Sequence, residues 1–288
     1  MSNLNKSLMP PTASRAQRLS KLFTIGMIVF AFFVVFMIFL VPFSGNDIDY
    51  EEADFVQLEE PSDDATVVVF ETNVGTFKAV LYEDKAPKYC EYFKKLVEDG
   101  YFLNTYVCSI LRNENGDEAG FIGGSKTKDG MSNEDTNTKM MKLEVSADLL
   151  PIKGSLCSLV KQGGIFTKSK AGSVVTFLND VTDDKALDEN LKQNGNVNGL
   201  ERVTEIFKEY GGVPNYLQMY TVFGQVYDGW DTYEKITTTP IVDEGVSDDK
   251  EDKNYQPQTE IKFKKVYLST YGENKENGYN LKYAPTAE

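Results

Sequence analysis

The sequence predicts a mainly β domain over residues 65–270, because three features follow one another in a fixed order near its start. These features are a hairpin, one amphipathic helix, and a strand that leads to a pair of glycines. The hairpin is predicted from two runs rich in β-branched and aromatic residues, 66–70 and 76–82, with Asn73 to Gly75 as the turn between them. Apolar residues alternate along Phe70 to Leu81, which favours strands with one buried face.

The helix is predicted from Ala86 to Asp99. Pro87 suits a first helical position, and Gly100 can end the helix. Apolar and aromatic residues recur within it at helical spacing: Tyr89, Tyr92, Phe93, Leu96 and Val97. A strand over 105–111 and the pair Gly123-Gly124 complete the order.

Several motifs in this domain resemble those of the cyclophilin-type peptidyl-prolyl isomerases. The run YTVFGQV from Tyr220 to Val226, followed by Gly229-Trp230-Asp231 and Ile236, is the most specific of them. AGSVVTF from Ala171 to Phe177 stands where the family has AGSQFFI. Residues 144–159 and 260–268 resemble two further family strands, the second of them the closing one.

The resemblance covers roughly residues 65–270 and implies a specific architecture. In the family, about eight antiparallel strands form a closed β-barrel, which leaves no free sheet edge. One helix covers each open end, here Ala86 to Asp99 and Gly229 to Ile236. Alternating apolar residues, such as those of Thr221 to Val226, would fill the interior.

The N-terminal region predicts a membrane anchor. Residues 1–21 contain four basic residues and no acid, and residues 22–43 are uncharged. At about 1.5 Å per residue in a helix, this uncharged run is long enough to cross a hydrocarbon core of about 30 Å. A cleaved signal peptide is the alternative, but its apolar core is normally only about 7–15 residues long. The charge asymmetry predicts a single-pass cell-membrane protein with a cytoplasmic N-terminus and its main domain outside the cytoplasm.

The charge distribution excludes one class of partner. Removing the four positive charges of residues 1–21 from the net charge of −14 leaves −18 for the rest of the chain. Nucleic-acid binding rests on phosphate neutralisation by Lys and Arg, so we expect none. An acidic surface instead favours solubility, or affinity for basic unfolded segments. Residues 44–64 are expected to form an extended acidic linker, and residues 271–288 a polar, disordered tail.

The cysteine and histidine counts limit the kinds of catalytic, metal and disulfide sites that the chain could form. The chain has no histidine, which excludes His-based triads and His-ligated zinc, and no cofactor is expected. Its three cysteines, Cys90, Cys108 and Cys157, fit no disulfide framework or metal motif. Buried free thiols are expected, while Cys108 and Cys157 lie on separate predicted strands and could be neighbours.

The resemblance also implies where a peptide would bind. Isomerases of this family use an apolar pocket and an arginine donor that a glutamine supports. In this sequence the arginine position is Ser109, and the glutamine position is Ile122. The other implied pocket positions are Val107, Leu159, Val160, Val174, Thr176, Asn215, Tyr216 and Tyr220. Of these, Tyr220 is an accepted family variant, and the main chain near Leu159 and Val160 would pair with the peptide.

Other cations are poor replacements for the missing arginine. Arg112 lies three positions beyond Ser109, so in a regular strand it points to the opposite face. Lys161, Lys168 and Lys170 lie on predicted loops near the pocket, and the sequence supports them no better than Arg112 as replacements for the arginine.

An insertion over residues 178–214 departs from the family pattern. Within it, apolar residues at helical spacing predict a helix from Leu200 to Tyr210 that Gly211-Gly212 ends. The helix could flank the pocket as a lid, or it could be a structural decoration.

The sequence is compatible with two functions, and a third possibility is a purely structural barrel without activity. The first is a membrane-tethered isomerase that assists folding of exported proteins, with a degenerate site and weak activity. The second is an inactive chaperone or envelope assembly subunit that binds peptides. Both imply proline-containing or unfolded polypeptide segments as partners.

Overall fold

The computed structural model describes residues 48–113, 115–130, 141–161, 170–187, 191, 198–242 and 255–282 of the chain. The chain divides into two units, 1–47 and 48–288, and all described residues belong to the second. The predicted membrane span, 22–43, therefore lies outside the described residues. Within them, no helix combines the length and apolar character needed to cross a membrane.

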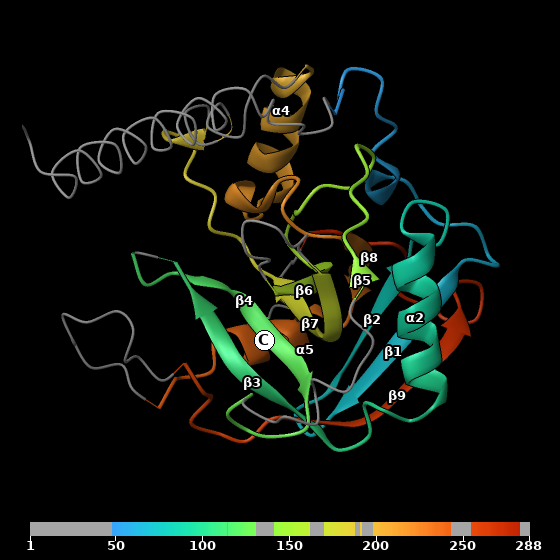
Figure 1. The fold of residues 1–288 in the computed structure, drawn as a ribbon, viewed down its shortest axis with the longest axis vertical. Coiled ribbons are helices and arrows are strands. Elements are labelled where there is room, and N and C mark those ends of the chain that lie inside the picture. The colour runs from blue at the N-terminus through green and yellow to red at the C-terminus, as the bar shows by residue number, and fades with distance from the viewer. Residues whose placement is uncertain are drawn as a thin grey trace, which may run out of the picture. The chain divides into compact units, whose positions relative to one another are not determined.

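Eight antiparallel strands close into a barrel (Figure 1). They are β1 (Thr66–Thr72), β2 (Thr76–Leu81), β3 (Thr105–Arg112), β4 (Glu118–Ser125), β6 (Ser155–Lys161), β7 (Lys170–Leu178), β8 (Val222–Asp228) and β9 (Lys262–Thr270). Their order around the barrel is β4-β3-β9-β1-β2-β8-β6-β7, and β7 pairs with β4 to complete the ring. The two-residue strand β5 (Met141–Lys142) pairs with β7 outside this ring. The predicted eight-stranded closed barrel is confirmed.

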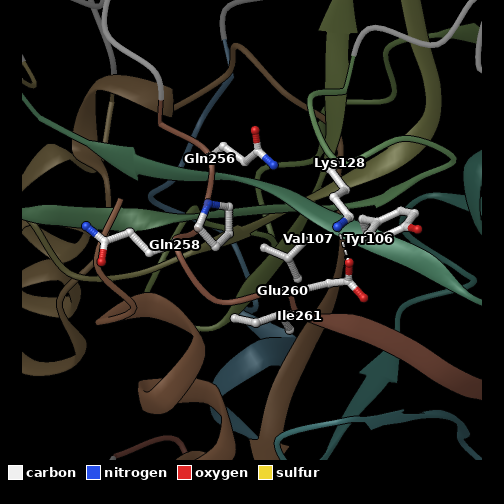
Figure 2. Close-up of a pocket in the computed structure, with 8 residues that line it drawn as sticks. Tyr106, Val107, Lys128, Gln256, Gln258, Glu260 and Ile261 are labelled. Carbon is white, nitrogen blue, oxygen red and sulfur yellow. Dashed lines mark ion pairs between the residues drawn. The ribbon is translucent and has the colours of Figure 1, made fainter. Parts of the chain in front are cut away.

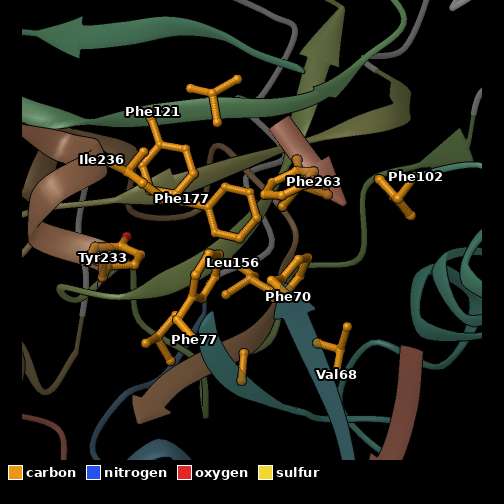
Figure 3. Packing of buried hydrophobic residues seen from close by; sticks show 14 of the residues in the cluster. Val68, Phe70, Phe77, Phe102, Phe121, Leu156, Phe177, Tyr233, Ile236 and Phe263 are labelled. Carbon is orange, nitrogen blue, oxygen red and sulfur yellow. The ribbon is translucent and has the colours of Figure 1, made fainter. Parts of the chain in front are cut away.

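Phenylalanine rings fill the centre of the barrel (Figure 3). Phe70 and Phe77 stack across the predicted hairpin with ring centroids 4.7 Å apart, and Phe121 and Phe177 stack at 4.5 Å. Phe263 on β9 lies 5.5 Å from Phe70. Each such pair stabilises the fold by about 0.5–1.5 kcal/mol beyond the burial of its area. The interior is thus packed with aromatic side chains.

The two predicted barrel helices pack against this core from different sides (Figure 3). In α2 (Pro87–Glu98), Phe93 lies 5.3 Å from Phe102 and 5.1 Å from Phe223. In α5 (Trp230–Thr237), Tyr233 lies within 6 Å of two central phenylalanines, at 5.8 Å and 5.4 Å. Both helices begin and end within one residue of the predicted bounds.

A distant carboxylate caps helix α2. Ala86, the residue before the helix, offers no capping side chain. The carboxylate of Glu144 accepts hydrogen bonds from the backbone N–H groups of Tyr89 at 2.7 Å and Lys88 at 3.3 Å. Helix N-terminal N–H groups need such acceptors, and a negative charge there is favourable. Glu144 therefore ties the loop before β6 to α2.

Helix α4 (Leu200–Tyr210) forms within the insertion as predicted. Val203 and Phe207 on its apolar face are fully buried, and Gly211 follows with φ of 68°. This face does not close over the barrel. It packs in a second core with the loop at Leu150 and with residues near the start of the described chain.

The expected acidic linker is wrong for its residues 48–58. Tyr50 and Phe55 are 1% and 5% exposed, and residues 56–58 form a short 3₁₀ helix, η1 (Val56–Leu58). Arg202 of α4 donates hydrogen bonds to the carbonyl of Tyr50 at 2.7 Å and lies over the ring of Phe55 at 4.8 Å. The acidic residues of this segment are exposed, whereas its aromatic residues are buried. The many acidic residues suggested an extended linker, although the segment packs against the domain.

The expected disordered tail is also wrong for residues 271–282. Tyr271 is 1% exposed, and Trp230 of α5 donates its indole N–H to the carbonyl of Asn280 at 2.9 Å. The hydroxyl of Tyr279 donates to the carbonyl of Gln57 at 2.7 Å. The tail and the segment before β1 therefore pack together on the domain.

Candidate functional site

Three predicted pocket residues lie side by side on the outer face of the barrel. Ser109 on β3 pairs with Ile122 on β4, and Ile122 pairs with Thr176 on β7. Directly paired residues on antiparallel strands have Cβ atoms about 4.5–5.5 Å apart and share one face. Ser109 and Ile122 are half-buried, whereas Thr176 is only 2% exposed. We call these three residues the outer row.

A β-bulge in β3 sets which residues face outward. Val107 pairs with Gly123 and Ser109 pairs with Ile122, so Cys108 is an extra residue on β3. Val107 and Ile110 belong to the barrel core, at 3% and 0% exposure. Val107 thus belongs to the barrel core and also lines a hollow beside β3, whereas the bulge turns Ser109 to the outer face. A role of Val107 in a peptide pocket remains a prediction.

Two tyrosines border the buried end of the outer row. Thr176 pairs with Cys157 on β6, and Cys157 packs in one cluster with Tyr216 and Tyr220. The two tyrosine rings lie 4.4 Å apart. Burial raises the pKa of both hydroxyls above the usual range, and for Tyr216 the neighbouring Tyr220 adds to the rise. Both hydroxyls therefore stay neutral donors at physiological pH.

The remaining predicted positions are placed less favourably. Asn215, at the family's tryptophan position, is exposed on the 3₁₀ helix η3 (Pro214–Tyr216) and does not line the row. Val174 is half-buried on β7. Leu159 and Val160 lie on β6, and Val160 pairs with Ala171 on β7. The main chain of both residues is thus part of a strand, as predicted.

Arg112 has its own partners at the end of β3. Its guanidinium donates to the Glu118 carboxylate at 2.5 Å and to the carbonyl of Gly116 at 3.1 Å. These contacts hold it at the turn between β3 and β4. The side chains of Lys161, Lys168 and Lys170 lie outside the described residues.

The outer row is uncharged and combines one apolar side chain with two hydroxyl groups. Ser109, Ile122 and Thr176 carry no ionisable group, and the Oγ1 of Thr176 has no hydrogen-bond partner among the described residues. Leu111, further along β3, is half-buried. Such a surface can hold an extended apolar peptide, but it offers no charged donor of its own.

A small hollow beside β3 adds charged residues that the sequence analysis missed (Figure 2). It is lined by Tyr106, Val107, Lys128, Gln256, Pro257, Gln258, Glu260 and Ile261. Lys128 and Lys262 both form ion pairs with Glu260. Lys128 and Glu260 are far apart in the sequence, and no motif connects them. Within the described part of the chain, no cluster of Cys, Asp and Glu could hold a metal ion.

The three cysteines are free and buried, as expected. Burial raises the pKa of the Cys90 thiol to about 12 and also raises that of Cys157. Cys108 and Cys157 are not neighbours: β4 and β7 separate their strands, a span of about 14 Å at about 4.8 Å per strand. A disulfide needs Cα atoms within about 7 Å, so this pair cannot form one here. The thiols of Cys90 and Cys157 are therefore unreactive packing groups.

Relatives of known class resemble the chain over most of the barrel. A protein of Staphylococcus saprophyticus named as a peptidyl-prolyl cis-trans isomerase is 27% identical over 176 residues, which cover 60% of this chain and 82% of that protein. A Staphylococcus aureus protein of the same name is 26% identical over 193 residues, covering 66% and 90%. The peptidyl-prolyl cis-trans isomerase-like 1 of Aspergillus oryzae is 32% identical over 102 residues, covering 34% and 58%.

A solved structure and a family model agree with these relatives. The crystal structure of a Cryptosporidium parvum cyclophilin type peptidyl-prolyl cis-trans isomerase superposes with a TM-score of 0.50 at 20% identity, covering 72% of this chain and 98% of that one. This likeness supports the fold. The model of the family described as cyclophilin type peptidyl-prolyl cis-trans isomerase/CLD matches residues 67–267. With its barrel closed and most of its length matched, this chain belongs to the cyclophilin-type peptidyl-prolyl cis-trans isomerase family.

Proposed function

We propose that the protein binds proline-containing or unfolded segments of exported polypeptides on its outer row and isomerises them weakly. The observation that carries this proposal is the register of Ser109, Ile122 and Thr176 on three neighbouring strands of a family barrel. The barrel keeps a surface at the family's position and has different side chains on it. An inactive peptide-binding chaperone or assembly subunit is the second candidate, favoured by the missing arginine.

The chemistry explains why activity would be weak. Rotation about a peptide bond faces a barrier of about 18–20 kcal/mol because amide resonance must be broken. An apolar surface lowers this barrier somewhat by removing water from the bond. A preorganised donor contributes far more, since removing one typically costs about 10²–10³ in rate. Ser109 and Ile122 stand where the family has its arginine and supporting glutamine, so most of that contribution is missing.

The membrane part of the proposal rests on sequence. Residues 22–43 are uncharged, basic residues precede them, and acidic residues follow. The protein would thus be anchored with its barrel outside the cytoplasm. We expect the full chain to remain in the membrane fraction after a high-salt or alkaline wash, and its barrel to be digested by protease added to intact cells. Release by the wash, or full protection from protease, would contradict this placement.

Restoring the arginine is expected to raise activity. Ser109→Arg should increase kcat/KM for an Ala-Pro-containing peptide about tenfold, since one charged donor is regained at about 1.4 kcal/mol. Leu111→Arg is the matched control, because it places the same charge on β3 opposite Gly120 rather than Ile122. The measurement is a peptide isomerisation assay with the full-length chain in mild detergent.

The same assay separates the two candidate functions. Weak catalysis by the natural chain supports the isomerase. If the natural chain does not catalyse isomerisation and only Ser109→Arg does, the result supports an inactive peptide-binding protein. If neither chain turns over or binds the peptide, the outer row is not a peptide site and both candidates fail.

A further inference from the structure

The loop that follows β4 packs against β3 next to Ser109 and contains Lys128. Gly130 lies so close to Cys108 that a Cβ atom there would be 3.1 Å from the Cys108 sulfur. Cys108 is the bulge residue directly before Ser109. Two residues earlier in the same loop, the ammonium of Lys128 lies 6.0 Å from the ring centroid of Tyr106 on β3. Lys128 and Gly130 therefore lie along β3, at Tyr106 and at Cys108 next to Ser109.

The resting partner of Lys128 is shared with a second lysine. Glu260 forms ion pairs with Lys128 and, at 2.6 Å, with Lys262. Hydrogen bonds from Lys128 and then from Lys262 hold the pKa of the Glu260 carboxyl below its usual range. Lys262 also lies over the ring of Tyr106, 4.8 Å from its centroid. If Lys128 moves away, Glu260 keeps Lys262 as its counterion.

Lys128 is also free to reach outward. Its side chain is 54% exposed, against 32% for Lys262. A lysine ammonium carries three donors on a flexible four-carbon stem. Figure 2 shows Lys128 and Glu260 joined at the edge of the hollow, next to Tyr106. Tyr106 and Ser109 are three residues apart, at most about 10 Å along the strand at about 3.3 Å per residue.

We propose that Lys128 is a peptide-binding residue of this protein. When a peptide lies on the outer row, the Lys128 ammonium leaves Glu260 and donates a hydrogen bond to a backbone carbonyl of the peptide. The outer row has no cation of its own, so this donor supplies the charged contact that Ser109 cannot make. The inference rests on the proposed function and assigns a specific residue to it. A donor on a carbonyl holds the peptide without weakening amide resonance, so Lys128 acts on affinity and not on the rotation step.

The test is peptide affinity measured by fluorescence anisotropy. The probe is a labelled Ala-Ala-Pro-Phe peptide, and the protein is the full-length chain in mild detergent. Lys128→Gln should weaken binding about tenfold, which corresponds to about 1.4 kcal/mol, and leave kcat unchanged. Lys128→Arg should retain binding because it keeps the charge. Lys95→Gln is the matched control and should bind like the natural chain, because it removes an exposed lysine that pairs with Asp99 on α2 instead of with Glu260.

Two further variants test the mechanism. Glu260→Gln removes the resting partner of Lys128 and should bind the peptide more tightly than the natural chain. In a Ser109→Arg background the new guanidinium replaces the lysine contact, so Lys128→Gln should then have little effect. Tighter binding by Glu260→Gln and a lost effect of Lys128 in Ser109→Arg support a direct contact.

Each contrary result has a defined meaning. Lys128→Gln that binds like the natural chain, or Lys95→Gln that weakens binding equally, overturns the role of Lys128. Weaker binding by Glu260→Gln contradicts the release of Lys128 from that carboxylate. If the natural chain binds no peptide at all, the proposed function fails and this inference fails with it. Peptide binding that is unaffected by Lys128→Gln leaves the proposed function in place.

Discussion

A chain that begins at Ala65 is expected to unfold about 10–20 °C below one that begins at Ser44. Residues 48–58 were expected to be a linker, yet they supply part of a second core. Removing them exposes the partners of Tyr50 and Phe55, each of which contributes roughly 1.5–3 kcal/mol by burial. With about 2–4 °C of melting temperature per kcal/mol for a domain of this size, a loss of roughly 5 kcal/mol gives the expected shift.

Removing Gln57 also lowers the stability of the domain, because buried hydrogen bonds are lost in addition to the apolar contacts. Its amide accepts a hydrogen bond from the Leu150 N–H at 2.5 Å and donates to the Leu150 carbonyl and the Gln225 side chain at 3.0 Å each. Gln57 and Gln225 are 1% and 0% exposed. Without Gln57, these buried groups lose a partner, at about 1–3 kcal/mol for each group left unsatisfied. Ordering the segment costs entropy, so the net estimate stays near 5 kcal/mol.

Thermal melting followed by circular dichroism is the measurement. The matched control is the chain from Ser44 with Glu51→Ala and Glu52→Ala, since both side chains lie exposed in the same segment and their loss should leave the melting temperature unchanged. Phe55→Ala in the longer chain should reproduce part of the loss. Equal melting temperatures for the two starting points would mean that residues 48–58 do not stabilise the domain.

The parts of the fold that follow from local pattern were predicted well from sequence. Helices α2 and α4 each form where apolar spacing and glycine predict them, because a helical repeat of apolar residues can be recognised within one short stretch of sequence. Helix α5 forms where the family resemblance implies it. The closed barrel followed from motifs shared with a family. Residues 48–58 were missed because their aromatic rings pack on α4, about 150 residues later, and nothing in an acidic stretch reveals such partners.

The candidate site was predicted less completely, for a geometric reason. Strand alternation assigns faces correctly only while the register is regular, and the bulge at Cys108 breaks it. Ser109 and Ile122 pair directly across β3 and β4, whereas Val107 joins the barrel core. Lys128 and Glu260 were missed because only the closed barrel brings the loop after β4 beside the segment before β9.

Rebuilding two side chains together is expected to give the largest gain in activity. The double variant Ser109→Arg/Ile122→Gln should raise kcat/KM about 100-fold over the natural chain, near the lower end of what one preorganised donor contributes. Both positions are half-buried and directly paired, so the new side chains fit on the surface and contact each other. The glutamine amide would accept from the guanidinium and hold it in place, which a single arginine lacks.

Thr176 is deliberately left unchanged in this variant. It is 2% exposed, and a phenylalanine there would overpack the region of Cys157 and the tyrosine pair at a cost of about 1–3 kcal/mol. Ile122→Gln alone is the control and should not change the rate, because glutamine acts only by supporting the arginine. Peptide isomerisation measured beside thermal melting distinguishes a catalytic gain from a change in folding. A double variant no faster than Ser109→Arg would mean that the two positions do not meet at one peptide bond. A gain confined to the pair would mean that this barrel keeps the geometry of an isomerase and lacks only the side chains.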